Sequence, residues 1–304
     1  MAVRVRGVLR LARPIPLVTW TATTVVLGWT NAQGYTPQWG FVLVGVLLGG
    51  VLLQGYITHG LNDLYDWDSG TDQTTSGVIS GGSHVFRQGL LTARHVWLAV
   101  AVATVVYGVL LILVTQARGS ALAILGVVAI TAAAAYSVPP LRLCYRPLLG
   151  EWLGIFPPVV AGVLAVGIAV GGHVTLLLAA VALVQGVLCV ASVMEHHLVD
   201  VDSDWATHPQ KRTSPAVWQR GHGRPGSQVA LLYQVFAVAL SLGSALFVSP
   251  RFWWSAAIAT CGIWVALQTR TGDHADETRR DWMLKGLAVL HSVGYVALAI
   301  AGIR

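Results

Sequence analysis

Long stretches of apolar residues, separated by short polar or glycine-containing connections, follow one another along the whole chain. Several of these stretches approach the ~20 residues that an α-helix needs to cross a bilayer. Because they continue from end to end, we expect one membrane domain over residues 1–304. The pattern predicts an all-α, polytopic membrane protein with about nine transmembrane helices. The predicted helices are 12–32, 39–61, 95–116, 119–137, 149–171, 174–197, 226–248, 252–269 and 283–302.

The composition agrees with this interpretation. Hydrophobic residues make up 55% of the chain and charged residues only 11%, whereas a soluble domain usually carries about 25% charged residues. Disordered chains have low hydrophobicity, so that class is excluded. The first apolar stretch runs from about Ile15 past Trp29. It is longer than the ~7–15 residue core of a signal peptide, and we therefore expect it to be the first membrane helix.

The basic residues are distributed as expected for a membrane protein with a defined orientation. If the N-terminus is cytoplasmic, sixteen of the 19 Lys and Arg residues fall in cytoplasmic segments, and only Arg118, Arg251 and Arg304 fall outside. Such an asymmetry is the positive-inside rule. Nucleic-acid binding would instead need the basic residues on one exposed face. We therefore expect a multi-pass protein of the cell membrane (inner or plasma), with the lipid bilayer and no nucleic acid as partner.

Most acidic residues lie in two long cytoplasmic connections, 62–94 and 198–225. Long connections in compact proteins tend to be functional. Asn62 and Asp66 end the second predicted helix, and Asp200 and Asp204 follow the sixth, 138 residues later. This spacing predicts a repeat of two four-helix groups plus one helix. In such repeats, equivalent helix ends lie at the same depth, which predicts a site on the cytoplasmic side.

The spacing of these acidic residues points to metal-bound phosphate. Residues four apart share one face of a helix, and two such acidic faces at one surface would repel each other without a cation. Magnesium commonly takes one or two carboxylates and completes its shell with water and phosphate oxygens. The predicted Mg²⁺ ligands are Asn62, Asp66, Asp72, Asp200 and Asp204. The side chains predicted to hold a diphosphate are Asn62, Arg87, Arg142, Lys211 and Arg212.

An alternative is that these acidic residues are solvated loop residues without a special role. Two clusters with matched spacing, each beside basic residues, favour the functional interpretation. Asp63 and Asp202 point off the shared faces and are expected to be bystanders. His59, one turn before Asp63, is expected to be a packed helix histidine.

At these residues the sequence resembles the UbiA superfamily of intramembrane prenyltransferases. The first motif is similar to the family's N-D-x-x-D followed by further aspartates, and the second to D-x-x-x-D followed by K-R-T, here Lys211-Arg212-Thr213. The stretch 136–142, Y-S-V-P-P-L-R, and the loop 81–91 also resemble family segments. The resemblance implies nine helices around a central chamber, with Mg²⁺ and an isoprenyl diphosphate bound at the two aspartate motifs.

Within the superfamily, the first motif is similar to the branch that prenylates 1,4-dihydroxy-2-naphthoate in menaquinone synthesis. That branch typically reads N-N-x-R-D at the second motif, whereas this chain has His196, His197 and Val199 before Asp200. The departure leaves the acceptor open. A transition-metal site formed by Glu195, the two histidines and Asp200 is a further alternative, although adjacent residues rarely supply convergent ligands.

The resemblance implies that a prenyl group is transferred from a prenyl diphosphate to an aromatic or quinone-precursor acceptor. The residues expected to be catalytic are Asp66 and Asp200 at the metal, Tyr136 and His197. The ring of Tyr136 would shield the allylic cation, the alternative being an anchor at the membrane interface. His197 would form a hydrogen bond to the acceptor or to Asp200, or act as a base on the acceptor. Two alternatives are kept. A UbiA-type terpene cyclase would act on the diphosphate alone, and a transporter or lipid-binding protein would perform no chemistry.

Overall fold

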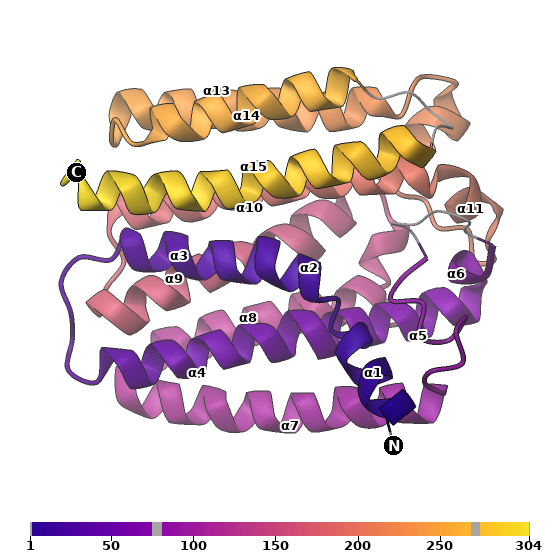
Figure 1. The fold of residues 1–304 in the computed structure, drawn as a ribbon, viewed down its shortest axis with the longest axis horizontal. Coiled ribbons are helices and arrows are strands. Elements are labelled where there is room, and N and C mark those ends of the chain that lie inside the picture. Colours follow the sequence, from indigo (N-terminus) through magenta and orange to yellow (C-terminus); the bar gives the residue numbers. More distant parts are fainter. Residues whose placement is uncertain (1, 75–80, 269–273, 304) are drawn as a thin grey trace.

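A computed structural model describes residues 2–74, 81–268 and 274–303. All regular elements in these ranges are helical. The long helices run back and forth along one common axis, so that their connections gather at the two ends of the molecule (Figure 1).

The first half of the chain forms a set of antiparallel helices after a short amphipathic helix, α1 (Ala2–Leu11). Two of these long helices contain a π-helical stretch, which is a wider turn that is frequent at functional sites. Helix α5 ends at Gly70, whose φ of 89° is easily adopted only by glycine. The elements are α2 (Pro14–Pro16), the π-helical Leu17–Ala22, α3 (Thr23–Thr30), α4 (Trp39–Val51), the π-helical Leu52–Thr58, α5 (His59–Ser69), α6 (Thr71–Thr74), α7 (Ala93–Arg118) and α8 (Ser120–Ser137).

The second half again consists of long helices, with short helical elements between some of them. Helix α10 is the most buried of the membrane-length helices, and it packs against α9 and α13. The elements are a 3₁₀ turn (Leu143–Tyr145), the π-helical Gly150–Ile155, α9 (Phe156–Gly171), α10 (Leu176–Val199), α11 (Val201–Ala206), α12 (Ser214–Ala216), the π-helical Val217–Gly221, α13 (Ser227–Phe247), α14 (Phe252–Leu267) and α15 (His274–Ile300).

The expected all-α membrane architecture is confirmed, and each predicted helix range contains helix. By length and hydropathy, seven helices in the described ranges can cross a membrane. Phe252–Leu267 is apolar but shorter, so helix length alone does not establish the predicted number of nine. Two boundaries were wrong. The second helix continues through the first aspartate motif to Ser69, and the last helix begins at His274 instead of 283.

Apolar side chains cover both the interior and the outer surface. A core cluster that includes Ile57, Leu61 and Val96 joins α5 to α7, and a second that includes Leu178 and Phe252 joins α10 to α14. On the outside of α7, large side chains such as Val105 and Ile112 are exposed. Extended apolar exposure of this kind is unusual for a soluble monomer and suits contact with lipid tails.

The two ends of the molecule differ in character. Both aspartate motifs lie at one end, where α6 contacts α11, at the right in Figure 1. At the opposite end, Arg118 donates hydrogen bonds to the carbonyls of Pro37 and Ala169. Arg251 there donates to Oδ1 of Asn31 at 2.7 Å. The fold therefore brings the two acidic segments together at one end. At the other end, two of the arginines predicted to lie outside the cytoplasm hold the connections in place by hydrogen bonds.

Candidate active site

A cavity of about 650 Å³ extends between the helices from the acidic end toward the opposite end. Its lining changes from charged to apolar along this path. Asp66, Asp72 and Asp200 line the acidic end. The side chains of α4, α7, α8 and α9 line the far part, among them Val46, Leu111, Val114, Leu122, Leu125 and Ala165.

Asp66 is the centre of the polar network at the acidic end. Its carboxylate accepts hydrogen bonds from Nδ2 of Asn62 at 2.7 Å, from Nζ of Lys211 at 2.8 Å and from the hydroxyl of Tyr145 at 3.2 Å. The same Tyr145 hydroxyl lies 2.9 Å from Oγ of Ser69. Asn62 and Asp66 are one turn apart on α5, so the continuation of this helix places both side chains on the cavity.

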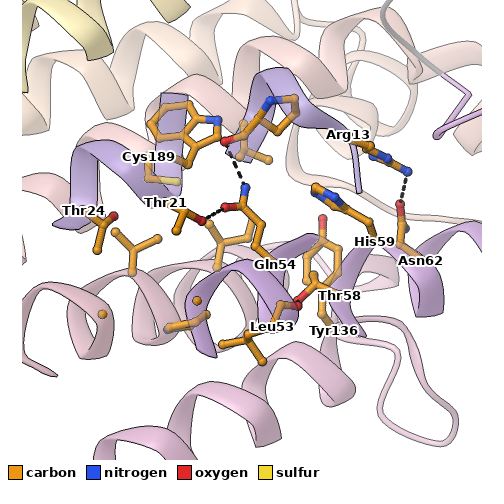
Figure 2. Close-up of a pocket in the computed structure, with 18 of the residues that line it drawn as sticks. Arg13, Thr21, Thr24, Leu53, Gln54, Thr58, His59, Asn62, Tyr136 and Cys189 are labelled. Carbon is orange, nitrogen blue, oxygen red and sulfur yellow. Dashed lines mark hydrogen bonds between the residues drawn. The ribbon is translucent and has the colours of Figure 1, made fainter. Parts of the chain in front are cut away.

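Asp63 lies off this face, as expected, but it has a structural partner. It is 1% exposed and forms an ion pair with Arg13, and it accepts hydrogen bonds from the hydroxyl and the backbone N–H of Ser83. Arg13 also reaches Oδ1 of Asn62 at 3.3 Å (Figure 2). Asp63 therefore fixes both the loop after the first motif and the segment at Arg13, just before α2, onto α5.

The second motif lies at a break between two helices. Helix α10 ends at Val199, Asp200 adopts a non-helical conformation, and α11 begins at the next residue. The backbone N–H of Asp204 still donates to the carbonyl of Asp200 at 2.7 Å. Asp200 lines the cavity, whereas Asp204 is buried behind Lys211, whose Nζ is 3.6 Å from Asp204 Oδ1.

Two of the crowded carboxyl groups, Asp72 and Asp204, lie outside the membrane-spanning helices and have raised pKa values. Burial, with the nearby charges of Asp66 and Asp63, raises the pKa of Asp72 to about 8. Burial likewise raises the pKa of Asp204 to about 8. For Lys211, burial alone would lower the pKa, but Asp204 and Asp66 outweigh it, and the pKa lies well above its usual value. The nearby cations therefore do not fully offset burial and repulsion at Asp72 and Asp204, and both carboxyl groups favour the protonated form near neutral pH when no metal is bound.

The side chains at the acidic end suit magnesium when phosphate oxygens complete its shell. Over the ranges that the structure describes, no three His, Cys, Asp or Glu side chains are arranged to hold a metal ion by themselves. Lys211 lies between Asp66 and Asp204 in this arrangement. Magnesium, however, needs only one or two carboxylates when phosphate oxygens complete its shell. Asn62, Asp66 and Asp72 provide hard oxygen donors at the wall of the cavity, and this chemistry fits.

Three of the four cations expected at a diphosphate do not lie among the described residues that line the cavity. Arg87 is exposed and donates to the backbone carbonyls of Asp72 and Gln73 at 2.9 and 3.2 Å. The guanidinium of Arg142 lies over the rings of Tyr65 and Tyr145. Arg212 is also exposed. Lys211 is the predicted cation that lies at the carboxylates.

Tyr136 and His197, the other predicted catalytic side chains, both line the cavity. Figure 2 shows Tyr136 in the same wall as His59 and Asn62. His59 also lines the cavity, and its Nδ1 lies 3.3 Å from the carbonyl of Ala12. His59, about one turn before Asn62, thus lies on the same cavity as the first motif.

The transition-metal alternative at the second motif is not supported by the geometry of the described side chains. Glu195 forms an ion pair with Arg280 at 3.4 Å. His196 instead approaches Asp281, with 2.9 Å between Nε2 and Oδ1. The side chains that the sequence places next to one another therefore diverge toward different partners on α15.

Several residues of the site were missed in the sequence. Tyr145 and Arg13 bind the two aspartates of the first motif across long sequence separations. Asp281 and Lys285 line the cavity from α15, although the sequence pattern assigned Asp281 to a loop. Their i, i+4 spacing was the available signal, because such a pair supports a helix.

Gly82 provides a first testable feature of the site. Its φ is 71°, and a Cβ there would collide with Oδ2 of Asp72 and Oδ1 of Asp63. We expect Gly82→Ala to lower the free energy of unfolding by more than about 1 kcal/mol and to weaken Mg²⁺-dependent binding of a prenyl diphosphate. Gly89→Ala is the matched control, because Gly89 has a φ of 62° but no atom within 4 Å of its Cβ position. Thermal unfolding and donor binding would be measured for both. Equal donor binding in the two variants would contradict a role of the Gly82 contact in shaping the site.

Comparison with known proteins agrees with this geometry. The sequence profile of the UbiA prenyltransferase family matches residues 18–289. The fold is similar to that of a UbiA homologue from Archaeoglobus fulgidus bound to GPP and Mg²⁺, with 15% identity and a TM-score of 0.70 over 96% of this chain and 99% of that chain. The form bound to DMAPP and Mg²⁺ gives a TM-score of 0.69 at 15% identity, with the same coverage.

A structure of digeranylgeranylglyceryl phosphate synthase in membranes gives a TM-score of 0.63 at 14% identity, over 98% of this chain and 99% of that chain. No curated protein matches the sequence. At these identities the structural likeness shows the fold, while the profile match extends over most of the 304 residues. The chain belongs to the UbiA prenyltransferase family.

Proposed function

We propose that this intramembrane prenyltransferase transfers a prenyl group from a Mg²⁺-bound prenyl diphosphate to an aromatic or quinone-precursor acceptor. The observation that carries the proposal is the change of lining along one cavity. Carboxylates and Lys211 line its acidic end, and apolar side chains line the part that extends toward the opposite end of the molecule. A diphosphate with an isoprenoid tail has the same polarity along its length. The A. fulgidus homologue of similar fold, bound to GPP and Mg²⁺, supports this choice of donor class.

The dimensions of the cavity suit an extended tail. Gly49 lines it and lies 17 residues before Asp66 in one continuous helix. At 1.5 Å per residue, these positions are about 25 Å apart along the helix axis. The donor's tail would extend from the aspartates toward Tyr107 and Val114, surrounded by apolar side chains that exclude water.

The chain's own residues would act on the leaving group. Asn62, Asp66, Asp72 and Asp200 would hold the magnesium, which supplies positive charge to the diphosphate as its bond to carbon breaks. Lys211 lies 2.8 Å from Asp66 and would donate to phosphate oxygens at the same wall. The ring of Tyr136 would face the allylic cation. We place this end of the molecule on the cytoplasmic side, on the basis of the distribution of basic residues.

The acceptor class rests on the similarity to the menaquinone-pathway branch, and a product assay would test it. The purified protein would be incubated with Mg²⁺, prenyl diphosphates of increasing length and hydroxylated aromatic acids that include 1,4-dihydroxy-2-naphthoate. We expect an alkylated aromatic product, identified by mass, that is lost when EDTA is added. A hydrocarbon formed from the donor alone would instead support a terpene cyclase. Solute flux in proteoliposomes without any diphosphate release would support a transporter.

The position of Gly49 leads to a prediction about donor length. A Cβ at this position would lie 3.6 Å from the ring of Tyr107, so Gly49→Leu would fill part of the cavity's far half. We expect the variant to retain turnover of short prenyl diphosphates and to lose turnover of long ones. Gly108→Leu serves as control, because Gly108 has open space around it. Kinetics with each donor length would be compared. An equal effect on short and long donors would contradict the proposed path of the tail.

A further inference from the structure

A second group of charged side chains lines the cavity from the side of α15. Asp281 forms an ion pair with Lys285, one turn further along the same helix. Nε2 of His196, on α10, lies 2.9 Å from Oδ1 of Asp281. All three residues line the cavity. Asp281 is 7% exposed in its side chain and His196 32%, so the carboxylate is enclosed while the imidazole is accessible from the cavity.

The position of His196 relates this group to the aspartate end. His196 is four residues before Asp200, and both line the same cavity from α10. One helical turn therefore separates the imidazole from the carboxylate at the second motif, which is about 6 Å along the helix axis. Cys189 and Val193 continue this face deeper into the cavity. His196 thus lies one turn below the metal site, on the side where the donor's first carbon would follow its diphosphate.

The imidazole is held in place from behind. Arg280 and Glu195, the neighbours of Asp281 and His196 in the sequence, form a buried ion pair with side-chain exposures of 6% and 3%. Two adjacent contacts thus join α10 to α15, one directed away from the cavity and one lining it. A carboxylate that contacts one nitrogen of a histidine fixes the ring's orientation and its tautomer. The position of Asp281 Oδ1, 2.9 Å from Nε2, favours a proton on that nitrogen, which would leave Nδ1 as the basic nitrogen of the ring.

We propose that His196, oriented by Asp281, accepts the proton that an aromatic acceptor loses when it is prenylated. The proposal rests on the proposed function and adds the acceptor side of the site. In the step, the bond between the first prenyl carbon and oxygen breaks and its electron pair leaves with the diphosphate. A bond forms between that carbon and a ring carbon of the acceptor. The ring proton passes to Nδ1 of His196, and the imidazolium is stabilised by the carboxylate of Asp281.

The proposal reassigns the base from His197, predicted from the sequence, to its neighbour. Both histidines line the cavity, but it is His196 that lies against the carboxylate of Asp281. Lys285 balances the charge of Asp281 while the histidine is neutral. The acceptor class that fits is a ring activated by hydroxyl groups, because such a ring is nucleophilic at carbon and loses a proton after alkylation.

Three variants would test the proposal in the full-length protein with Mg²⁺. His196→Gln keeps a polar side chain but removes the base, Asp281→Asn removes the orienting charge, and His173→Gln is the control at an exposed histidine. We expect His196→Gln to bind a labelled prenyl diphosphate like the wild type and to lose about 100-fold or more in kcat with 1,4-dihydroxy-2-naphthoate or another accepted aromatic. Asp281→Asn, a positioning variant, should lower kcat in the same direction without changing the KM for the donor.

The donor-binding measurement separates this inference from the proposed function. If the wild type does not bind the donor, the proposed function and the inference both fail. If donor binding is intact and His196→Gln transfers at the wild-type rate, the inference alone is wrong. If His196→Gln fails to fold, judged by thermal unfolding, Asp281→Asn carries the test, and wild-type kcat in that variant would overturn the proposal. A hydrocarbon product from the donor alone, with every aromatic ignored, would also overturn it.

Discussion

Asp66→Asn is expected to reduce Mg²⁺-dependent turnover by about 10³-fold or more while leaving the helical fold intact. Asp66 accepts hydrogen bonds from three side chains at the acidic end of the cavity, and one of them is the buried Lys211. Asparagine keeps the size and one carbonyl oxygen but removes the charge that would attract the metal. The variant also removes one partner of the buried Lys211, which keeps Asp204 at 3.6 Å, while the loss of one negative charge reduces repulsion with Asp72. The cost in stability should therefore be smaller than that of removing Lys211 itself.

Asp68→Asn is the matched control for this experiment. Asp68 lies on the same helix, two residues further, but its side chain is exposed. Turnover of a prenyl diphosphate, its Mg²⁺ dependence and thermal unfolding in detergent would be measured for both variants. We expect Asp68→Asn to match the wild type in all three. Full activity in Asp66→Asn would remove this residue from the catalytic site.

Lys211→Met is expected to destabilise the metal-free protein by about 3–5 kcal/mol, the cost typical of breaking a buried ion pair by removing one partner. Nζ of Lys211 lies 2.8 Å from Asp66 and 3.6 Å from Asp204, and all three side chains are less than 10% exposed. Methionine has a similar length but leaves both carboxylates without this cation. Added Mg²⁺ should recover part of the loss, since a divalent cation at the acidic end would stabilise the same carboxylates.

Thermal unfolding in EDTA and in Mg²⁺ would measure this effect, with Arg212→Met as the control. Arg212 is the next residue in the chain and is exposed, so its removal should change stability by less than about 0.5 kcal/mol. A Lys211→Met variant as stable as the wild type in EDTA would show that the carboxylates do not depend on this lysine. A loss that Mg²⁺ does not affect would argue against a metal site at Asp66.

The membrane helices could be predicted from the sequence because long apolar stretches leave few other structures possible in lipid. The start of the last helix could not be predicted in this way, because the helix begins at His274, before its apolar part. Its first part holds Arg280, Asp281 and Lys285, which resemble a polar connection in the sequence. In the structure, each of these charges has a partner, either on α15 or on α10. The pairing of Arg280 with Glu195 joins segments distant in sequence, and hydropathy does not report it.

The candidate site was predictable in its acidic half and less so in its cations. The i, i+4 spacing of Asn62 and Asp66 requires only that the helix continue, and it does. Arg87 and Arg142 lie in connections whose direction the sequence does not determine, and they bind backbone carbonyls and tyrosine rings instead. Lys211 reaches Asp66 although 145 residues separate them, and its presence there depends on how the two helix groups pack.

The π-helical stretch Leu52–Thr58 has a consequence for how this chain tolerates change in length. A π-helical turn contains one more residue than an α-helical turn, so the stretch sets the angular offset between the chamber-lining face of α4 and the aspartate face of α5. Deleting one residue there would turn Asn62 and Asp66 by about 100° relative to α4. An insertion or deletion in this segment would therefore rotate the aspartate face away from the apolar part of the chamber, a change of register that no single substitution there produces.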